Sequence, residues 1–445
     1  MAQLESETPS ATERPARSRQ RRFRLHPIIV RVLAWMGTCW AILGLFLSPV
    51  LPGGWWFILV ATLLSAAPLL GLRRWFGGVA TPSAWARLFV IRPFWYTQLA
   101  LPLLVIAGVF GGLVGLIFAT AGYGGRIAIT IVAVIFALGM LAGWVGSRWL
   151  VVRQLDVRLQ QLPPALAGLR IVQVSDLHVG PQTSRRHLAR IAAAVHAAHP
   201  DLIAITGDQV DDYAADAAHF ARAFGDLTAP LGVYAIAGNH DVYAGWDAVR
   251  AGLEQMGIRV LVNEAVQLQH NGAAFWLAGT GDPAGTSVQR GTEKVAPDLV
   301  RTMADVAPAD FSIVLAHNPV LWPPLAQAGA DLTLSGHTHH GQLSIPRLGW
   351  SMASPFLKHA MGAHREGPSL LYINPGTNFW GIPFRIGALP EVSVLTLRSA
   401  ATGENSIEAA QPETLLHPLL WIFCGARSAP RAGEFTGSPC APTTG

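Results

Sequence analysis

The chain has 445 residues, of which 51% are hydrophobic and only 13% are charged. It is too long for one compact domain of ordinary size, and the charge deficit, concentrated in the first third, argues against a chain that is soluble throughout. The net charge is +5, but the basic residues form no long patch with interleaved aromatic residues, so we expect no nucleic-acid partner. The three cysteines form no CxxC pair, which disfavours a zinc–thiolate site, and no obligate protein partner is evident.

Residues 1–27 form a basic segment that we expect to be disordered, and four apolar stretches follow it before residue 150. Each stretch is close to the roughly 20 residues that cross a bilayer as a helix. The stretches lie at 28–51, 55–72, 99–121 and 127–146. We therefore predict a transmembrane domain of about four helices over 28–147, with two or three helices as the alternative. Few ionisable residues lie inside the stretches, which favours an anchor over a transport pathway.

The arginines of the short loops indicate the orientation of these helices. Arginine is frequent before the first stretch, between the second and third, and after the fourth, whereas only Arg126 lies in the loops expected on the other side. Because positive residues favour the cytoplasmic side, we predict that everything after residue 147 is cytoplasmic. The expected location is the inner membrane, as a multi-pass protein surrounded by membrane lipids.

Beyond the apolar stretches, short β-rich runs alternate with helical segments over about 160–398. The β-rich runs are continuously apolar, which is typical of sheets that are covered on both faces. We predict a layered α/β domain over this range. Residues 399–445 are rich in Ala, Pro, Gly and Thr and are expected to form a low-complexity tail.

Five of the predicted strands are each followed by side chains that can bind metal ions. In open α/β sheets the site lies at the carboxyl ends of the strands, so one geometry would bring all of these side chains together. Two carboxylates, one amide and four imidazoles are too many for one tetrahedral ion, and they suit two ions bridged by a carboxylate. Each residue alone could be an ordinary turn or core residue, but chance is unlikely to produce the whole set. The candidate ligands are Asp176, His178, Asp208, Asn239, His317, His337 and His339.

The motifs D-x-H, G-D, G-N-H-D, H and G-H-T-H, in this order, resemble the calcineurin-like metallophosphoesterase superfamily over about 168–398. The match is closer to its bacterial membrane-associated branch, because VSDLHVG, TGDQVDD, GNHDVY and GHTHHGQ are present. The resemblance implies a double β-sandwich flanked by helices, with two catalytic metals. By the resemblance, the first metal takes Asp176, His178 and His339, the second takes Asn239, His317 and His337, and Asp208 bridges them.

The resemblance also implies roles for neighbouring residues. His240 is similar to the histidine that assists the leaving group, Asp241 would orient its imidazole, and Asp211 would support the bridging loop. His340 departs from the pattern, because the branch usually has glycine after GHTH. We favour a solvent-facing His340 over one that narrows the pocket or contacts substrate. Arg385 and the turn at 374–377 are candidates for holding phosphate, with a structural role as an equal alternative.

The sequence thus predicts a membrane-anchored, metal-dependent hydrolase of phosphodiester, phosphomonoester or pyrophosphate bonds. Its nitrogen- and oxygen-rich site suits two divalent ions of Mn, Fe or Zn. An anchor places the site near lipid headgroups, so a phospholipid or a nucleotide-linked lipid is a candidate substrate. One alternative is a UDP-2,3-diacylglucosamine pyrophosphatase-type lipid-A enzyme. The other is a non-catalytic metal-binding scaffold, which the complete set of ligands and His240 disfavours.

Overall fold

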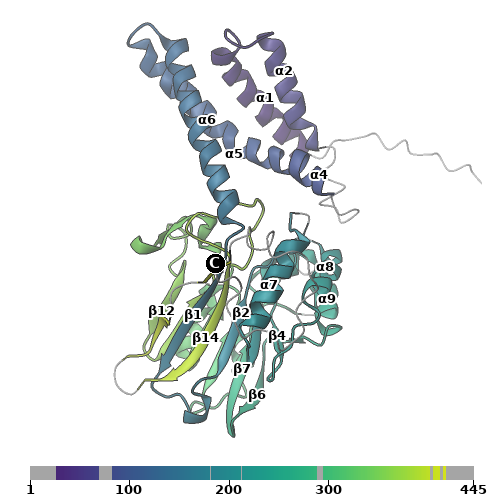
Figure 1. Ribbon diagram of the computed structural model, residues 1–445, viewed down its shortest axis with the longest axis vertical. Coiled ribbons are helices and arrows are strands. Elements are labelled where there is room, and N and C mark those ends of the chain that lie inside the picture. The colour runs from purple at the N-terminus through teal and green to yellow at the C-terminus, as the bar shows by residue number, and fades with distance from the viewer. Residues whose placement is uncertain are drawn as a thin grey trace, which may run out of the picture.

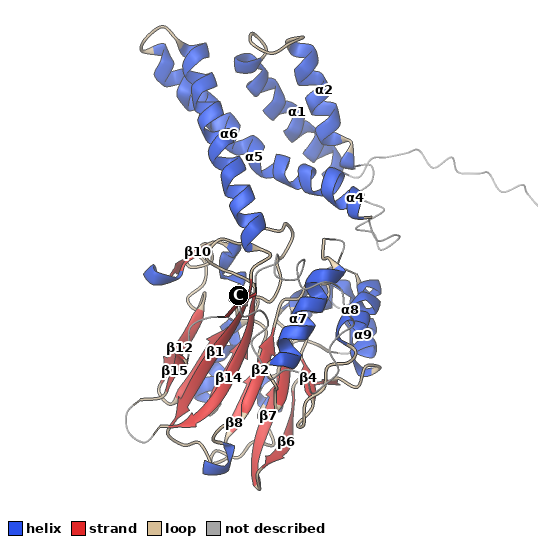
Figure 2. Ribbon diagram, viewed as in Figure 1, coloured by secondary structure: helices blue, strands red, loops and turns tan. Residues whose placement is uncertain are grey.

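The computed structural model describes residues 27–69, 83–180, 182–211, 213–287, 294–400, 404–410 and 414–416. The expected disordered N-terminus, apart from Pro27, and the part of the expected tail after residue 416 lie outside these ranges. Figures 1 and 2 show two parts, a group of helices and a domain built on sheets.

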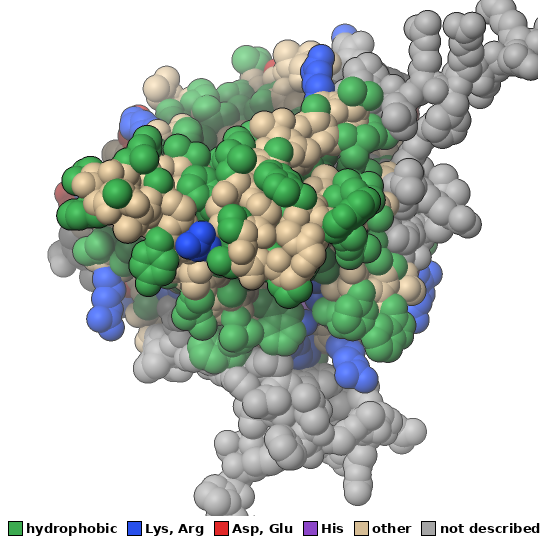
Figure 3. Space-filling model, turned by 90° about the horizontal axis from the view of Figure 1, so that it is seen from above, with side chains coloured by type: hydrophobic (Ala, Val, Ile, Leu, Met, Phe, Trp, Pro, Cys, Tyr) green, Lys and Arg blue, Asp and Glu red, His purple; other side chains and the backbone are tan. Residues whose placement is uncertain are grey.

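The first part consists of apolar helices. They are α1 (Pro27–Leu47), α2 (Trp55–Ala66), α5 (Arg92–Leu116) and α6 (Ala121–Gly146), and the short α4 (Ala84–Ala86) runs through a π-helical turn at Arg87–Ile91 into α5. Glycines allow α5 and α6 to approach closely, because a Cβ on Gly111 would lie 2.5 Å from the Cβ of Ala128. Seen from above, hydrophobic side chains dominate the surface of this part (Figure 3).

Among the described residues, three helices are long and apolar enough to cross a membrane, where about four were expected. They span 29–47, 87–116 and 121–146. The second expected stretch forms the 12-residue α2, which ends just before Pro68, a residue that has no N–H to donate to the helix. The third helix starts at Arg87 rather than near residue 99, because the π-helical turn continues it without a break.

The second part contains two mixed sheets. The larger has the order β15-β1-β14-β2-β3-β4-β5, with β16 beside β1, and the smaller has the order β12-β13-β9-β8-β7-β6. Strands β2, β3 and β4 are parallel neighbours, as are β7, β8 and β9. The larger sheet comprises β1 (Leu150–Leu159), β2 (Arg170–Val174), β3 (Leu202–Ile205), β4 (Val233–Ala235), β5 (Arg259–Val260), β14 (Glu391–Ser399), β15 (Ser406–Ala409) and β16 (Thr414–Leu416). The smaller comprises β6 (Glu264–His270), β7 (Ala273–Gly279), β8 (Ser312–Leu315), β9 (Leu332–Ser335), β12 (Gly362–Glu366) and β13 (Ser369–Ile373).

Apolar side chains fill the space between the sheets and cover their outer faces. Ile171, Leu202, Phe275 and Ile313 belong to the core between the two sheets. Helices α7 (Arg185–Ala197), α8 (Ala217–Phe224) and α9 (Asn239–Glu254) cover the outer face of the larger sheet. On the outer face of the smaller sheet, α12 (Trp322–Gln327) contributes to the apolar packing. The predicted fold class, helices followed by a double sandwich flanked by helices, is confirmed.

The larger sheet extends beyond the predicted range of 160–398 at both ends. Strand β1 lies before residue 160 and pairs in parallel with β14, while β15, from the predicted tail, pairs antiparallel with β1. Both strands join the sheet because β1 buries Leu155, Val157 and Leu159 against the other sheet. Only residues 147–149 separate α6 from β1, so the last of the three membrane-length helices ends directly beside the domain (Figure 1).

Candidate metal centre

The predicted ligands lie where parallel strands of the two sheets end. Asp176 and His178 follow β2, Asp208 follows β3, and Asn239 follows β4 in the larger sheet. In the smaller sheet, His317 follows β8, and His337 and His339 follow β9. Both sheets therefore present their carboxyl ends to one edge, as the strand-end pattern predicted.

Left-handed backbone recurs among these residues. The φ angles are +52° at Asp176, +38° at His178, +53° at Asp208, +70° at His337 and +49° at His339. Such angles are uncommon outside glycine and persist only where the surroundings enforce them, often at functional sites. Here the Asp176 N–H donates to the Gly207 carbonyl and the His178 N–H to the Asp208 carbonyl, both at 3.0 Å. The loops after β2 and β3 thus hold each other.

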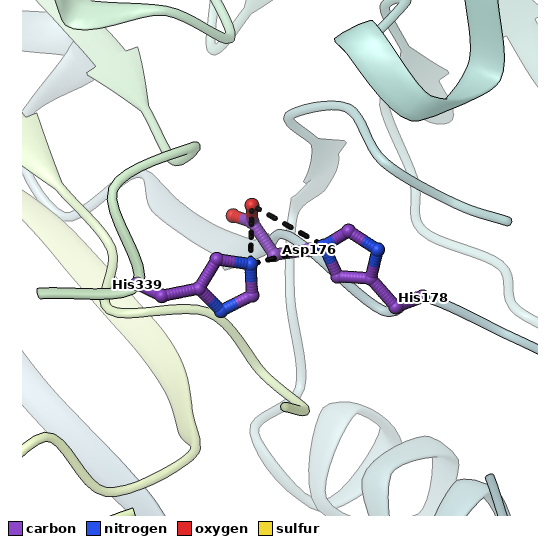
Figure 4. Close-up of side chains that lie close together, drawn as sticks. All are labelled: Asp176, His178 and His339. Carbon is purple, nitrogen blue, oxygen red and sulfur yellow. Dashed lines mark hydrogen bonds and ion pairs between the residues drawn. The ribbon is translucent and has the colours of Figure 1, made fainter. Parts of the chain in front are cut away.

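The first cluster joins Asp176, His178 and His339 (Figure 4). The two Nε2 atoms of His178 and His339 lie 2.9 Å apart. Asp176 Oδ1 is 3.3 Å from His339 Nε2 and 3.9 Å from His178 Nε2. All three side chains are buried, and Ser175 Oγ donates to the other oxygen of Asp176 at 2.6 Å. Two imidazole nitrogens and a carboxylate oxygen converge here without intervening protein atoms.

The second cluster joins His317, Asn239 and His337. The Oδ1 of Asn239 lies 3.2 Å from His317 Nε2 and 2.9 Å from His337 Nδ1. The other ring nitrogen of His317, Nδ1, lies 2.7 Å from the Thr206 carbonyl, which can only accept a hydrogen bond. His317 therefore donates through Nδ1, and its Nε2 faces the cluster with a free lone pair when the ring is neutral.

Asp208 lies between the two clusters. Its Oδ2 is 3.5 Å from His178 Nε2 and 3.3 Å from His317 Nε2. Its Oδ1 accepts the main-chain N–H of His240 at 2.8 Å, which fixes the carboxylate. One oxygen thus faces both clusters, which is the position that the sequence prediction of a bridging carboxylate requires.

The charges of the site are strongly coupled. Burial acts against ionisation of Asp208, but the facing His317 outweighs it and lowers the pKa of Asp208 well below its usual range. Burial likewise opposes a charge on His317, yet Asp208 and Asp176 raise its pKa well above the usual value. Burial lowers the pKa of His337 to about 4, and it lowers the pKa of His339 well below its usual value. The neutral imidazoles of His337 and His339 and the anionic carboxylate of Asp208 suit a divalent cation.

Asp211, not Asp241, supplies the observed orienting contact to His240. The Nδ1 of His240 lies 2.8 Å from the Asp211 carbonyl and 3.8 Å from its carboxylate. The buried Asp241 instead accepts the main-chain N–H groups of Gly238 and Val210, at 2.9 and 3.1 Å. Burial raises the pKa of Asp241 to about 7. The expected orienting role of Asp241 is therefore corrected: it joins the loops after β3 and β4, because it caps the start of α9.

Arg385 lies behind the site and does not face a substrate. Its side chain is fully buried, and its Nη1 donates to the carbonyls of His339 and Pro375, at 3.0 and 2.7 Å. Its Nη2 lies 2.9 Å from His339 Nδ1 and also donates to the Asn378 carbonyl. The guanidinium thus supports His339, and the structural alternative considered for Arg385 describes its contacts.

The turn at 374–377 is likewise structural. The side chain of Asn374 accepts the Gly376 N–H at 2.7 Å, and the Thr377 hydroxyl donates to the Glu391 carbonyl at 2.8 Å. The Thr377 N–H donates to the Ser175 carbonyl, which joins the turn to the loop of Asp176. Its polar groups therefore bind protein, so the turn supports the site from behind instead of forming an anion nest.

His340 is buried, which corrects the favoured solvent-facing interpretation. Its Nε2 lies 3.3 Å from the Ile373 carbonyl, and burial lowers its pKa to about 3. Its φ is +47°, a conformation that glycine adopts without strain. This angle gives a physical reason for the glycine that the family resemblance implies at this position.

Gly336 and Gly238 are needed because a larger side chain would not fit at these positions, more than because of their backbone conformation. A Cβ on Gly336 would collide with Ser175 Oγ and Asp176 Oδ2, and a Cβ on Gly238 would collide with Asp208 Oδ1. The loop after β9 can therefore approach the loop after β2, and the loop after β4 the loop after β3, only if these positions lack side chains. Sequence reasoning missed Ser175 and Thr206, although each directly precedes a motif. Ser175 holds Asp176, the residue that follows it, and Thr206 holds His317 of the other sheet.

The donors found here fit two metal ions. Each cluster offers imidazole nitrogen and carboxylate or amide oxygen atoms. The ligand atoms of Asp176, His178 and His339 lie within 4.8 Å of one another, and so do those of Asp176, Asp208 and His317. Residues 169–341 match the family model described as calcineurin-like phosphoesterase. The second part of the chain is a calcineurin-like phosphoesterase domain.

Relatives of this phosphoesterase domain occur in animals and bacteria. The chain is 30% identical over 262 residues to a transmembrane protein with metallophosphoesterase domain of Bos taurus, covering 56% of this chain and 57% of the relative. It is 29% identical over 248 residues to the metallophosphoesterase YkuE of Bacillus subtilis, covering 55% and 84%. The chain thus matches little more than half of the bovine protein.

Among solved structures, the chain is similar to the NAD nucleotidase of Haemophilus influenzae. The sequence identity is 16% and the TM-score is 0.34, with 47% of this chain and 45% of the other covered.

Proposed function

We propose that this protein is a membrane-anchored hydrolase of phosphoester bonds that uses two divalent metal ions. The observation that carries the proposal is the position of Asp208 Oδ2, within 3.5 Å of an imidazole nitrogen of each cluster. A carboxylate that binds a single ion would need only one of the two clusters beside it. We assign Asp176, His178 and His339 to one ion, and Asn239, His317 and His337 to the other. Mn, Fe and Zn all suit such mixed ligands.

Bound ions would supply positive charge to the phosphoryl oxygens and lower the pKa of a bound water. The protein itself fixes the ligands. Thr206 holds His317 through Nδ1, and Arg385 donates to the main-chain carbonyl of His339 from behind. Because these partners are buried main-chain and guanidinium groups, the ligands are oriented before any substrate arrives.

His240 is the proposed proton donor to the leaving group. Its Nδ1 donates to the Asp211 carbonyl, which orients the ring, and in the protonated ring Nε2 would carry the proton for the leaving group. The ring lies beside the first cluster, with its centroid 4.8 Å from that of His178, and its side chain stays partly exposed. Tyr243 and Trp380, both exposed, flank the ring at centroid distances of 5.6 and 5.9 Å. A partly exposed imidazole with aromatic neighbours suits contact with a bound substrate.

A lipid-linked phosphate is the proposed substrate class. Support comes from the three membrane-length helices and from α6, which ends three residues before the domain starts. A nucleotide-linked lipid of the UDP-2,3-diacylglucosamine type remains the alternative within this class. We keep the cytoplasmic side as the proposed side, and a reporter fused to the C-terminus and active only outside the cell would contradict it.

The test is hydrolysis by the purified full-length protein in lipid nanodiscs with manganese. We expect turnover of bis-p-nitrophenyl phosphate, and loss of turnover in His240→Asn with two metal ions still bound. A panel of phospholipids and nucleotide-linked lipids then defines the substrate. A non-catalytic scaffold would bind the metals and hydrolyse none of these compounds, and that result would overturn the proposal.

A further inference from the structure

The phosphoesterase domain carries a compact group of exposed apolar side chains beside the site. Strands β10 (Ser344–Ile345) and β11 (Trp350–Ser351) form a small hairpin in which Ile345 pairs with Trp350. Large apolar side chains project from it and from the following turn, with Leu348 74% and Phe356 82% exposed. We call this group the hairpin patch: Ile345, Leu348, Trp350, Met352 and Phe356.

The hairpin patch is joined by hydrogen bonds to the segment that contacts the last transmembrane helix. The Ser344 N–H donates to the Ile386 carbonyl at 2.9 Å, and the Ile386 N–H donates to the Gln342 carbonyl at 3.0 Å. The neighbouring Arg385 N–H donates to the carbonyl of Gly143 in α6 at 2.9 Å. The segment of Arg385 and Ile386 therefore connects the hairpin to α6 by main-chain hydrogen bonds. Strand β10 lies at the end of the domain that faces the helices (Figure 2).

The end of α6 marks the level of the membrane surface. Its 26 residues are long enough to cross the hydrocarbon core, and tryptophan and arginine gather at its C-terminal end. There the guanidinium carbon of Arg148 lies 3.5 Å from the centroid of the Trp144 ring. Because Gly143 contacts Arg385, the segment that holds the hairpin lies at this level.

The charge around the hairpin patch suits a lipid surface. No Asp or Glu occurs between Asp331 and Glu366, whereas Arg347 and Lys358 are exposed beside the patch. Apolar side chains flanked by basic residues are typical of segments that enter the headgroup region of anionic membranes. If water covered the hairpin patch, five large apolar side chains would be exposed to it together, which is unusual for the surface of a soluble protein.

We propose that the hairpin patch inserts into the interface of the bilayer that α6 spans, as a second contact of the domain with lipid. Gln342, next to the hairpin, exchanges hydrogen bonds with the main chain of Trp380, whose ring flanks His240. Insertion would therefore hold this rim of the site at the level of the headgroups. The proposal does not depend on the chemistry of the site.

The test measures the depth of single spin labels in the full-length protein. Cys39→Ala, Cys424→Ser and Cys440→Ser give a background without other labelling sites. Labels are attached through Leu348→Cys and Phe356→Cys, and the matched control is Ala309→Cys, an exposed position before β8, at the strand end opposite His317. The protein is placed in nanodiscs of phosphatidylcholine and phosphatidylglycerol, and collisions with oxygen and with a water-soluble nickel chelate are compared.

At positions 348 and 356 we expect the ratio of oxygen to nickel collisions to exceed that at position 309 several-fold. Equal ratios at all three positions would overturn the proposal. A second copy of the chain on the patch would instead shield both labels from both reagents and broaden their spectra with increasing protein density. That outcome would also overturn it. The metal content of each variant, measured in parallel, confirms that the domain is folded.

Discussion

The two edges of the sheets carry aspartates of different kinds. At the carboxyl edge, Asp176 and Asp208 follow their strands, are fully buried and face imidazoles. At the opposite edge, Asp201 and Asp331 precede β3 and β9, and each accepts the N–H of the first residue of a neighbouring strand at 2.8 Å. An aspartate beside a strand is thus no sign of a metal by itself. What distinguishes the site is left-handed backbone, full burial and converging imidazole nitrogens.

The largest expected effect comes from exchanging one aspartate at each edge. Asp208→Asn should lower turnover of bis-p-nitrophenyl phosphate by more than about 100-fold. Loss of a residue that only orients a metal ligand typically costs about 10–100-fold, and Asp208 is itself a proposed ligand. Asp201→Asn keeps an acceptor for the Arg170 N–H and should leave turnover unchanged. Equal losses in both variants would remove the distinction between the two edges.

The second prediction concerns the support behind His339. Arg385→Met should weaken metal binding, measured by calorimetry with manganese, by about 10–100-fold, because the main chain of His339 loses its hydrogen-bond donor. Arg398→Met is the matched control, since Arg398 is half exposed and pairs with Asp156 at 3.0 Å. Such a surface pair contributes only about 0–1 kcal/mol, so metal binding should not change. Unchanged metal binding in Arg385→Met would mean that His339 needs no support.

The third prediction extends the site to the membrane helix. A Cβ on Gly143 would lie within 2.8 Å of the Phe384 ring, whereas a Cβ on Gly139, one turn earlier, meets nothing within 4 Å. Gly143→Leu should therefore displace the segment of Arg385 and weaken metal binding several-fold. Gly139→Leu should bind metal as the unchanged protein does. If both variants behave alike, the contact between α6 and Phe384 does not position the site.

The smallest expected effect is a pH-dependent stability change at the opposite edge. Burial raises the pKa of Asp331 to about 6, above its unfolded value, so its contribution to stability is present at acid pH and lost as the pH rises through about 6. Asp331→Asn should raise the melting temperature at pH 7.5 by about 2–4 °C. This shift corresponds to a gain of about 1 kcal/mol in the free energy of unfolding, after allowance for the partial exposure of Asp331. The gain should shrink towards pH 4. Thermal unfolding at both pH values measures it, and a gain that is independent of pH would contradict this origin.

The donors could be predicted from the sequence because side-chain chemistry and strand ends are both visible there. Asp208 and His317 could be identified from their residue types and from their positions directly after apolar runs. The supports could not be predicted, since Arg385 and Asp241 act on main-chain groups whose positions depend on the fold. His340 was misjudged for the same reason, because its left-handed backbone is not visible in its side-chain type.

The boundaries of the domain were missed for a different reason. Strand β1 follows α6 after three residues, so its β pattern adjoins an apolar helix, and the domain was expected to start only at about 160. Strand β15 is short and lies in a segment of low complexity. Its place in the sheet depends on pairing with β1, a contact between residues about 250 positions apart.

Anomalous diffraction from crystals of the full-length protein grown with manganese tests the central claim most directly. We expect two peaks about 3.5–4 Å apart, on either side of Asp208 Oδ2, with His178 beside one and His317 beside the other. A single peak, or peaks away from Asp208, would contradict a two-metal centre built on this carboxylate.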